Sequence, residues 1–283
     1  MNAQVRGKLD LQFTNEASRT RMKLREVHPP SKVIRAFDIA NGGALVHLHN
    51  VSGGVLSGDH YEFIVDIERN AYAQITTTSA TRIYRQREGM PISTQINRIH
   101  VAQNGLLEWL PDPIIPFADS AYEQRTHITL ETGASLFYWE TVAPGREASG
   151  ERFLYEKLVL MLEIQAQGRP IAIENIQLEP HKRSLSSSAR LGNYDYFTTF
   201  YICKVGIEVA QWLALETALT EIAAQHNQHG ETVWGVSALV QHGVVIRGLA
   251  REGRQLSTGL FAFWNAARQA LYKEAAVLPR KVT

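Results

Sequence analysis

A succession of short alternating strands is the feature that most constrains how this chain can fold. From about residue 8 to about residue 200, short segments alternate apolar and polar side chains, and turn signals such as Asn41-Gly42-Gly43 and Asn104-Gly105 separate them. Short strands at regular spacing with glycine-rich turns are typical of all-β proteins. The predicted strands cover residues 8–13, 21–25, 44–49, 61–67, 72–77, 96–101, 125–130, 134–139, 153–164 and 171–178.

The alternation leaves two β architectures open. Repeated units of a small residue followed by a β-branched run suit the stacked coils of a β-helix, and they also suit a β-sandwich. Periodicity cannot separate these two. We expect a mainly β protein, a β-helix-like stack of short strands with two α-helices. No low-complexity linker interrupts the chain, so residues 1–283 are predicted to form a single domain.

The two helices are expected after residue 200. Residues 205–224 are rich in Ala, Leu, Glu and Gln, which are good helix formers. Residues 258–276 form the second candidate, with Ser257 placed to cap it and Pro279 just beyond its end. This second helix carries Phe261, Phe263 and Trp264, and we expect part of this aromatic surface to face a partner. Residues 233–240 and 244–249 read as a strand pair between the helices.

Composition narrows the functional classes. The net charge is +1, which argues against general binding to nucleic acid or to a membrane surface. The single cysteine, Cys203, allows no internal disulfide and no cysteine-based zinc site, and we expect it to be buried. The first residues lack an apolar signal-peptide core, and no stretch reaches the ~18 apolar residues of a membrane helix. A cytoplasmic location is therefore expected.

The turn from Gly145 to Glu151 has the glycine spacing of a phosphate-binding loop but not its chemistry. Two glycines are separated by four residues, and the next residue should be a lysine that reaches the phosphates. Glu151 stands there, and its carboxylate would repel them. We expect the chain to bind no nucleotide.

Candidate metal-binding and catalytic residues are scattered. His47 and His49 share one face of a strand, and His226 and His229 lie three residues apart, but neither pair has a third ligand nearby in sequence. The hydroxyl-rich segment Thr76–Thr81 could be a polar lining or an ordinary strand face. Acid–base chemistry on a β-helix would need paired carboxylates. These could come from Asp59, Glu108, Glu140, Glu151 and Glu174.

Five segments, in this order and spacing, resemble the UreD family of urease accessory proteins, which act in nickel insertion. The strings Leu48–Gly54 with Ser57-Gly58-Asp59, and Ile75–Arg85, resemble the family's glycine-rich and threonine-rich regions. The remaining matches are Leu107–Pro111, the turn made by Gly145-Arg146 with Gly150–Phe153, and the C-terminal Pro279-Arg280.

The resemblance implies a β-helix-like fold with a pair of helices and no catalytic activity. It implies a scaffold that binds a UreF-type helical protein, through it a UreG-type GTPase, and apo-urease. It also implies an internal polar tunnel as the nickel route. Position by position, its lining would include Asp59, Thr81, Glu140 and Glu174. Such oxygen ligands suit passing contacts with a hydrated divalent ion, so we expect no tight metal site and no tightly bound cofactor, only nickel in transit.

The sequence therefore predicts a non-enzymatic maturation factor for urease. The main alternative is a β-helix carbohydrate-active hydrolase or lyase that uses Asp/Glu pairs. A structural β protein without any metal role is the third possibility.

Overall fold

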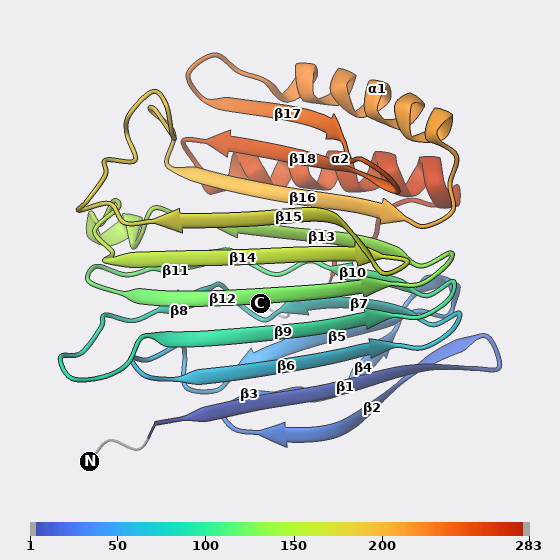
Figure 1. Cartoon of the computed structure of the whole chain (residues 1–283), viewed down its shortest axis with the longest axis horizontal. Helices are drawn as coiled ribbons and strands as arrows, with labels where there is room; N and C mark the ends of the chain where they lie inside the picture. The colour runs from blue at the N-terminus through green and yellow to red at the C-terminus, as the bar shows by residue number, and fades with distance from the viewer. Residues whose placement is uncertain (1–3, 280–283) are drawn as a thin grey trace.

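Two β-sheets lie face to face in the computed structural model, which describes residues 4–279 (Figure 1). The first sheet has seven strands in the order β15-β14-β12-β9-β6-β1-β2. Its strands are β1 (Arg6–Glu16), β2 (Arg19–His28), β6 (His60–Ile67), β9 (Ser93–Val101), β12 (Ala121–Leu130), β14 (Lys157–Ala166) and β15 (Arg169–Leu178).

The second sheet has eleven strands, eight of them in the order β17-β18-β16-β13-β10-β7-β5-β3. These are β3 (Ser31–Lys32), β5 (Ala44–Asn50), β7 (Tyr72–Thr77), β10 (Leu106–Trp109), β13 (Ser135–Val142), β16 (Tyr196–Lys204), β17 (Thr232–Ala238) and β18 (Gly243–Ala250). The short strands β4 (Ala36–Asp38), β8 (Thr81–Ile83) and β11 (Ile114–Pro116) pair beside this path. Two 3₁₀ turns, η1 (Ala40–Gly42) and η2 (Glu147–Ser149), complete the β region.

The chain alternates between the two sheets through the centre of the molecule. Strands β6, β9, β12 and β14 belong to the first sheet, and β7, β10 and β13 between them belong to the second. Within each sheet these central strands pair in parallel with one another. Antiparallel pairing replaces this pattern toward the edges, at β2 and β15 and again at β16, β18 and β17. The predicted mainly β class is confirmed.

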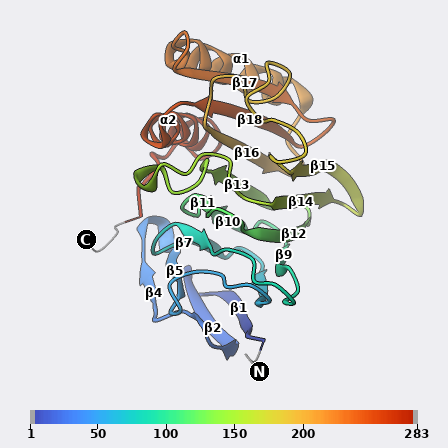
Figure 2. The ribbon, with the colours of Figure 1, turned by 90° about the vertical axis from the view of Figure 1, so that its left-hand side faces the viewer.

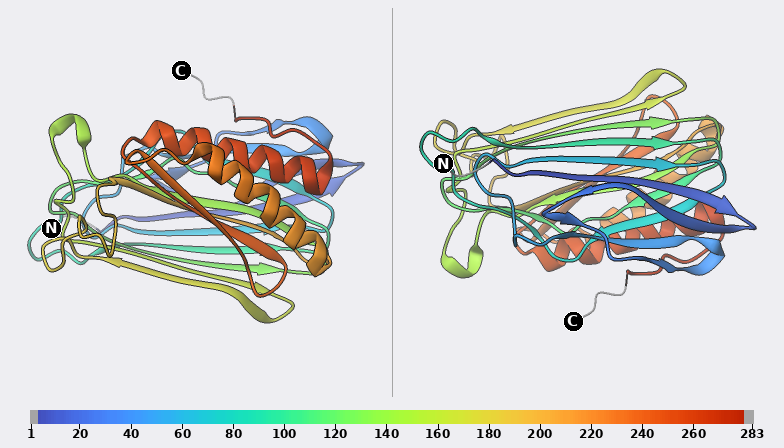
Figure 3. Two further views of the ribbon diagram at one scale, coloured as in Figure 1. Left: turned by 90° about the horizontal axis from the view of Figure 1, so that it is seen from above. Right: turned by 90° about the horizontal axis from the view of Figure 1, so that it is seen from below.

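The two helices cover the outer face of the second sheet, next to β16, β17 and β18. Helix α1 spans Val209–His226 and helix α2 spans Gly253–Tyr272. Figures 1 and 2 show both helices together at one end of the molecule, and the left view of Figure 3 looks down on them from that end. The molecule therefore has three layers at this end, namely the first sheet, the second sheet and the helices.

Both helices begin at residues other than the predicted ones. Helix α1 begins four residues later than expected because Gly206 adopts φ +93° and Val205 still donates its backbone N–H to Ala134 of the neighbouring strand end. Helix α2 begins five residues earlier, at a capping box formed by Glu252 and Gln255. The predicted cap, Ser257, lies one turn inside the helix, where its hydroxyl bonds the Gly253 carbonyl at 3.3 Å.

Apolar side chains fill both spaces between the layers. Between the sheets, residues such as Leu11, Val65, Ile99 and Ile128 are 0–3% exposed. The helices contribute a second cluster against the outer face of the second sheet, which includes Phe263 and Trp264. Cys203 is fully buried between the sheets, as predicted.

Candidate functional site

Polar side chains interrupt the apolar space between the two sheets along two neighbouring rows. Strand register places Tyr61, Gln95 and Gln124 side by side across β6, β9 and β12. The next row holds Asn97 and Thr126. Because alternate residues of a strand face the same side, these residues share the inner face with the apolar core residues further along each strand. The polar rows lie between two apolar clusters, one on each side along the strands.

Hydrogen bonds join these polar side chains across the strands. Gln95 donates to Asn97 at 2.9 Å, and Asn97 donates to the Thr126 hydroxyl at 2.9 Å. Gln124 donates to Glu140, which projects from β13 of the opposite sheet. The polar layer therefore spans the gap between the two sheets.

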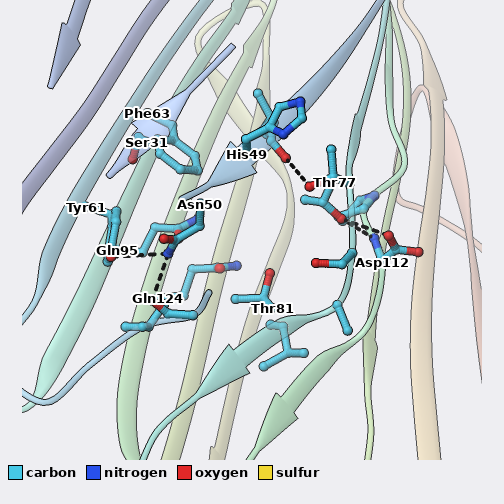
Figure 4. A pocket seen from close by; sticks show the side chains of 18 of the residues that line it. Ser31, His49, Asn50, Tyr61, Phe63, Thr77, Thr81, Gln95, Asp112 and Gln124 are labelled. Carbon is cyan, nitrogen blue, oxygen red and sulfur yellow. Dashed lines mark hydrogen bonds between the residues drawn. The ribbon is translucent and has the colours of Figure 1, made fainter. Parts of the chain in front are cut away.

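A cavity of about 90 Å³ opens within this layer (Figure 4). At roughly 30 Å³ per molecule in the liquid, this volume has room for a few waters. Ser31 borders the cavity, is 2% exposed, and its hydroxyl has no protein partner among the described residues, which fits a contact with water. The polar lining residues include Ser31, His49, Asn50, Thr77, Thr78, Ser79, Thr81, Gln95, Asn97, Asp112, Gln124 and Glu140.

Two of the four predicted path residues border this cavity. Thr81 reaches it from β8 and Glu140 reaches it from β13. The hydroxyl-rich segment that contains Thr81 forms much of one wall, since Thr77, Thr78 and Ser79 also line it. Figure 4 places Thr77, Thr81 and Asp112 on the same side of the pocket.

Asp59 is not among the residues that line the cavity. It is 4% exposed and accepts hydrogen bonds from the Leu56 backbone N–H at 2.9 Å and from the Tyr61 hydroxyl at 3.0 Å. Tyr61 in turn borders the cavity and accepts from Asn50 at 3.2 Å. Asp59 therefore holds a turn and orients Tyr61, one hydrogen bond away from the lining.

Glu174 lies further along the polar layer, on β15. Its carboxylate accepts a hydrogen bond from the Tyr201 hydroxyl at 3.2 Å and pairs with the Arg247 guanidinium at 2.9 Å. Its charge raises the pKa of Glu140, so the two carboxylates are electrostatically coupled. Of the four residues predicted for a nickel path, Thr81 and Glu140 therefore border the cavity, whereas Asp59 and Glu174 lie outside its lining.

Glu140 is the most perturbed acid in this region. Burial raises its pKa to about 7, against the opposing hydrogen bonds from Tyr138 and Gln124, and Glu174 adds to the rise. The Glu140 carboxyl therefore keeps its proton to a higher pH than an ordinary glutamate does.

The remaining candidate carboxylates are held elsewhere by cations. Glu108 faces the helix layer, where Arg268 pairs with it at 2.8 Å. Glu151 pairs with Arg146 and accepts the Ala118 backbone N–H at 3.1 Å. That ion pair ties together the turn that resembled a phosphate loop, so Glu151 has a structural partner.

The histidine pairs lie apart from each other. His49 borders the cavity, and burial, followed by the charges of His47 and Lys32, lowers its pKa. His226 lies at the end of α1, with its ring 6.4 Å from that of Phe263. Within residues 4–279, no group of three or more His, Cys, Asp or Glu side chains could together hold a metal ion.

Several residues of the polar layer were not singled out from the sequence, namely Asn50, Gln95, Asn97, Gln124, Tyr138, Tyr201 and Arg247. A signal was present for the amides. Gln95 and Asn97 occupy the same alternate positions as Ile99 and Val101, so the pattern predicts that the two amide side chains face the core. No comparable local signal marked Arg247.

Neither α1 nor α2, the two α-helices among the described residues, is long and apolar enough to cross a membrane.

The side chains of the polar layer present hydroxyl, amide and carboxylate oxygens, which are weak and exchangeable ligands for divalent cations.

Comparison with known proteins gives this site a family context. The family model for the UreD urease accessory protein matches residues 5–282. A urease accessory protein UreD of Herpetosiphon aurantiacus is 46% identical over 278 residues, covering 98% of this chain and 96% of the relative. UreD proteins of Cenarchaeum symbiosum and Halalkalibacterium halodurans are 34% and 31% identical, over 69% and 74% of this chain and 69% and 79% of their own lengths.

Four of the five segments that carried the resemblance have a structural role in the described residues. The glycine-rich and threonine-rich strings surround the cavity, Leu107–Pro111 carries Glu108, and the Gly145 turn is fixed by the Arg146–Glu151 pair. The C-terminal Pro279-Arg280 match extends to Arg280, which lies outside the described residues. With a family model across nearly the whole chain and a relative that shares close to half of its residues, this chain belongs to the UreD family of urease accessory proteins.

Proposed function

We propose that this chain is a non-enzymatic, cytoplasmic scaffold for urease maturation that links apo-urease to a UreF-type helical protein and, through it, to a UreG-type GTPase. In this proposal the polar layer guides nickel in transit between them, and no cofactor is bound tightly. The observation that carries the proposal is the polar layer itself, with a cavity of about 90 Å³ inside an otherwise apolar two-sheet core.

The cost of burying polar groups supports a role for this layer. Amides and carboxylates between two sheets destabilise a fold unless they are hydrogen-bonded or hydrated. Gln95, Gln124 and Glu140 stand where apolar residues would pack more simply. A hydrated, negatively lined passage lowers the energy of a passing divalent cation, and oxygen ligands release it again.

The geometry does not favour the carbohydrate-active alternative. Pockets that hold drug-sized or sugar-sized ligands usually measure about 300–1,000 Å³, whereas the cavity beside Glu140 measures about 90 Å³. Glu108 and Glu151, the other acids proposed for such chemistry, are held by arginines in separate places. The cavity beside Glu140 is therefore too small for a glycan to bind between Glu140 and Glu174.

The helix layer offers a surface for a helical partner, although not where the aromatic residues suggested. Phe263 and Trp264 are 0% exposed, so they belong to the core, and Phe261 is half-buried. On α1, by contrast, Val209 is 68% exposed and Leu213 is 52% exposed. An apolar face of this kind supports docking of the UreF-type partner on α1.

Urease nickel content and thermal melting, measured on the same variants, test the proposed path. We expect Glu140→Gln and Glu174→Gln to lower the nickel content of urease severalfold, while complex assembly is kept and neither variant melts much earlier than wild type. Asp59→Asn should instead lower the melting temperature, because Asp59 holds the Leu56 turn and Tyr61.

Glu163→Gln is the matched control, because Glu163 is a partly exposed carboxylate of β14 that pairs with His127. It should leave both measurements unchanged. The path proposal is wrong if nickel content in the Glu140 and Glu174 variants falls only in proportion to the amount of folded protein.

A further inference from the structure

The polar layer ends at an ion pair that joins the two sheets. Glu174 belongs to β15, the edge strand of the seven-stranded sheet, and Arg247 belongs to β18 of the eleven-stranded sheet. Their side chains meet with Arg247 Nη2 2.9 Å from Glu174 Oε1. The pair therefore closes the space between the sheets at the end of the polar layer that is remote from Ser31 and His49.

Strand register places Arg247 in line with Glu140. Glu140 of β13 pairs with Thr199 of β16, and Thr199 pairs with Arg247 of β18. Neighbouring strands lie about 4.8 Å apart, so the backbones of Glu140 and Arg247 are about 10 Å apart on the same row. The Glu174–Arg247 pair therefore lies beyond Glu140 on this row, outside the residues that line the cavity.

Both oxygens of Glu174 already have a partner. Arg247 pairs with Oε1, and the buried Tyr201 hydroxyl donates to Oε2 at 3.2 Å. Glu140 differs, because it accepts hydrogen bonds from the neutral side chains of Gln124 and Tyr138. Of the two coupled carboxylates, Glu174 is the one with a cation already in place.

The two side chains of the pair are exposed to different extents. The Glu174 side chain is 15% exposed and the Arg247 side chain is 57% exposed. Arg247 thus reaches inward from the surface, and its guanidinium can swing into water without opening the core. An ion pair with one exposed partner is screened by solvent and is easily exchanged.

We infer that Arg247 is a displaceable cation that closes the polar layer at Glu174. Its guanidinium takes the place that a passing divalent cation would take, and it returns when that cation leaves. When Glu140 and Glu174 are both ionised, the row carries a net charge of −1 with Arg247 in place and of −2 without it. Arg247 therefore favours release of the cation and opposes its retention. This inference rests on the proposed cation path.

Binding of Ni²⁺ to the purified full-length chain, without an affinity tag, tests the inference. Titration calorimetry would compare wild type with Arg247→Gln, Arg247→Lys and the double variant Arg247→Gln/Glu174→Gln. We expect Arg247→Gln to bind Ni²⁺ about tenfold more tightly, a factor that corresponds to about 1.4 kcal/mol. Arg247→Lys keeps the cation and should match wild type, and the double variant should lose the gain.

Arg251→Gln is the matched control, because Arg251 is a 55% exposed arginine that follows β18 and pairs with Glu231. It should bind Ni²⁺ as wild type does. Arg247→Met, which keeps an apolar stem, carries the same expectation as Arg247→Gln and replaces it if that variant melts early. Unchanged affinity in a folded Arg247→Gln or Arg247→Met variant, or an equal gain in Arg247→Lys, overturns the inference.

Urease nickel content separates this inference from the proposed function. In one outcome, Arg247→Gln binds Ni²⁺ more tightly, but neither this variant nor Glu140→Gln changes the nickel content of urease. Arg247 then occupies a cation site, and the proposed nickel path to urease is wrong. If Glu140→Gln lowers loading while Arg247→Gln leaves Ni²⁺ affinity unchanged, the path stands and the role of Arg247 fails.

Discussion

Glu108 on β10 and Glu140 on β13 lie on opposite faces of the same sheet, and their carboxylates have opposite surroundings. Glu108 is 0% exposed and accepts hydrogen bonds from Arg268 and Trp264 at 2.8 Å each, from Tyr72 at 2.8 Å and from Gln74 at 3.0 Å. Glu140 borders a cavity and receives neutral donors, Gln124 and Tyr138.

This difference means that the Glu108 carboxylate holds two layers of the fold together, whereas the Glu140 carboxylate remains able to bind a proton or a ligand in the cavity. Around Glu108 every carboxylate oxygen is occupied and a buried guanidinium balances the charge, so α2 is fastened to the second sheet. Arg268 also pairs with Glu274 at 2.6 Å, and Gln74 donates to the Val277 carbonyl at 3.3 Å, which fastens the segment after α2 as well. Among residues 4–279 no arginine, lysine or histidine forms an ion pair with Glu140, so protonation is what neutralises its charge.

Removal of the cation beside Glu108 is expected to have the largest effect. Arg268→Met leaves the Glu108 charge buried with neutral donors alone, and loss of one partner of a buried pair costs about 3–5 kcal/mol. Unfolding in urea should show a loss of this size. Lys182→Met, which breaks the exposed pair with Glu179, should cost no more than about 1 kcal/mol. A loss below about 1 kcal/mol for Arg268→Met would mean that Glu108 and Glu140 are less different than their contacts indicate.

The next effect is a pH dependence that Glu140 introduces. The pKa of Glu140 is raised from 4.5 to about 7, mainly by burial. A carboxyl group with a higher pKa in the folded state binds more protons when folded, so stability falls as pH rises through this window. The total fall is at most about 3 kcal/mol, at about 1.4 kcal/mol per pH unit.

Glu140→Gln removes this dependence, and the free energy of unfolding measured at pH 4.5 and pH 7.5 checks it. Relative to wild type, the variant should gain stability as the pH rises. The neighbouring Glu174 remains in both proteins, so its own titration largely cancels in the difference. Parallel stability curves for the two proteins would show that water in the cavity solvates Glu140 well enough to cancel the effect of burial.

Several features of the fold and of the polar layer could be predicted from the sequence, because they depend on local patterns. Strand alternation predicted the mainly β class. Composition rich in Ala, Leu, Glu and Gln predicted the first helix, and Ser257 and Pro279 marked the expected ends of the second. The helix ends were predicted less well, because Ser257 fits a cap as well as the Glu252–Gln255 box does. The inward position of Gln95 and Asn97 was also readable, since they share alternate positions with Ile99 and Val101.

The charge partners could not be predicted, because they depend on how distant strands and layers meet. Glu108 and Arg268 are 160 residues apart in sequence, and Glu174 and Arg247 are 73 residues apart. No local pattern distinguishes a carboxylate that will meet an arginine from one that will meet a cavity. The resemblance to the UreD family supplied Glu140 and Glu174 as candidates, and it supplied Asp59 equally, although Asp59 holds a turn.

The smallest effect tests whether the cavity beside Glu140 holds water. Ser31 and Ser120 are both buried, and neither hydroxyl has a protein partner among the described residues. Ser31 lines the cavity, whereas Ser120 is not among the lining residues. A buried hydroxyl without any partner destabilises a fold by about 1–3 kcal/mol, so its removal should stabilise the protein.

If water fills the cavity, Ser31 has a partner and Ser31→Ala changes the free energy of unfolding by no more than about 0.5 kcal/mol, or lowers it slightly. Ser120→Ala should then raise stability by about 1 kcal/mol, and the two alanine variants would differ in the sign of their effect. Equal stabilisation by both would mean a dry cavity. Glu140 would then lack the solvation that a passing cation needs, and the contrast with Glu108 would be one of charge balance alone.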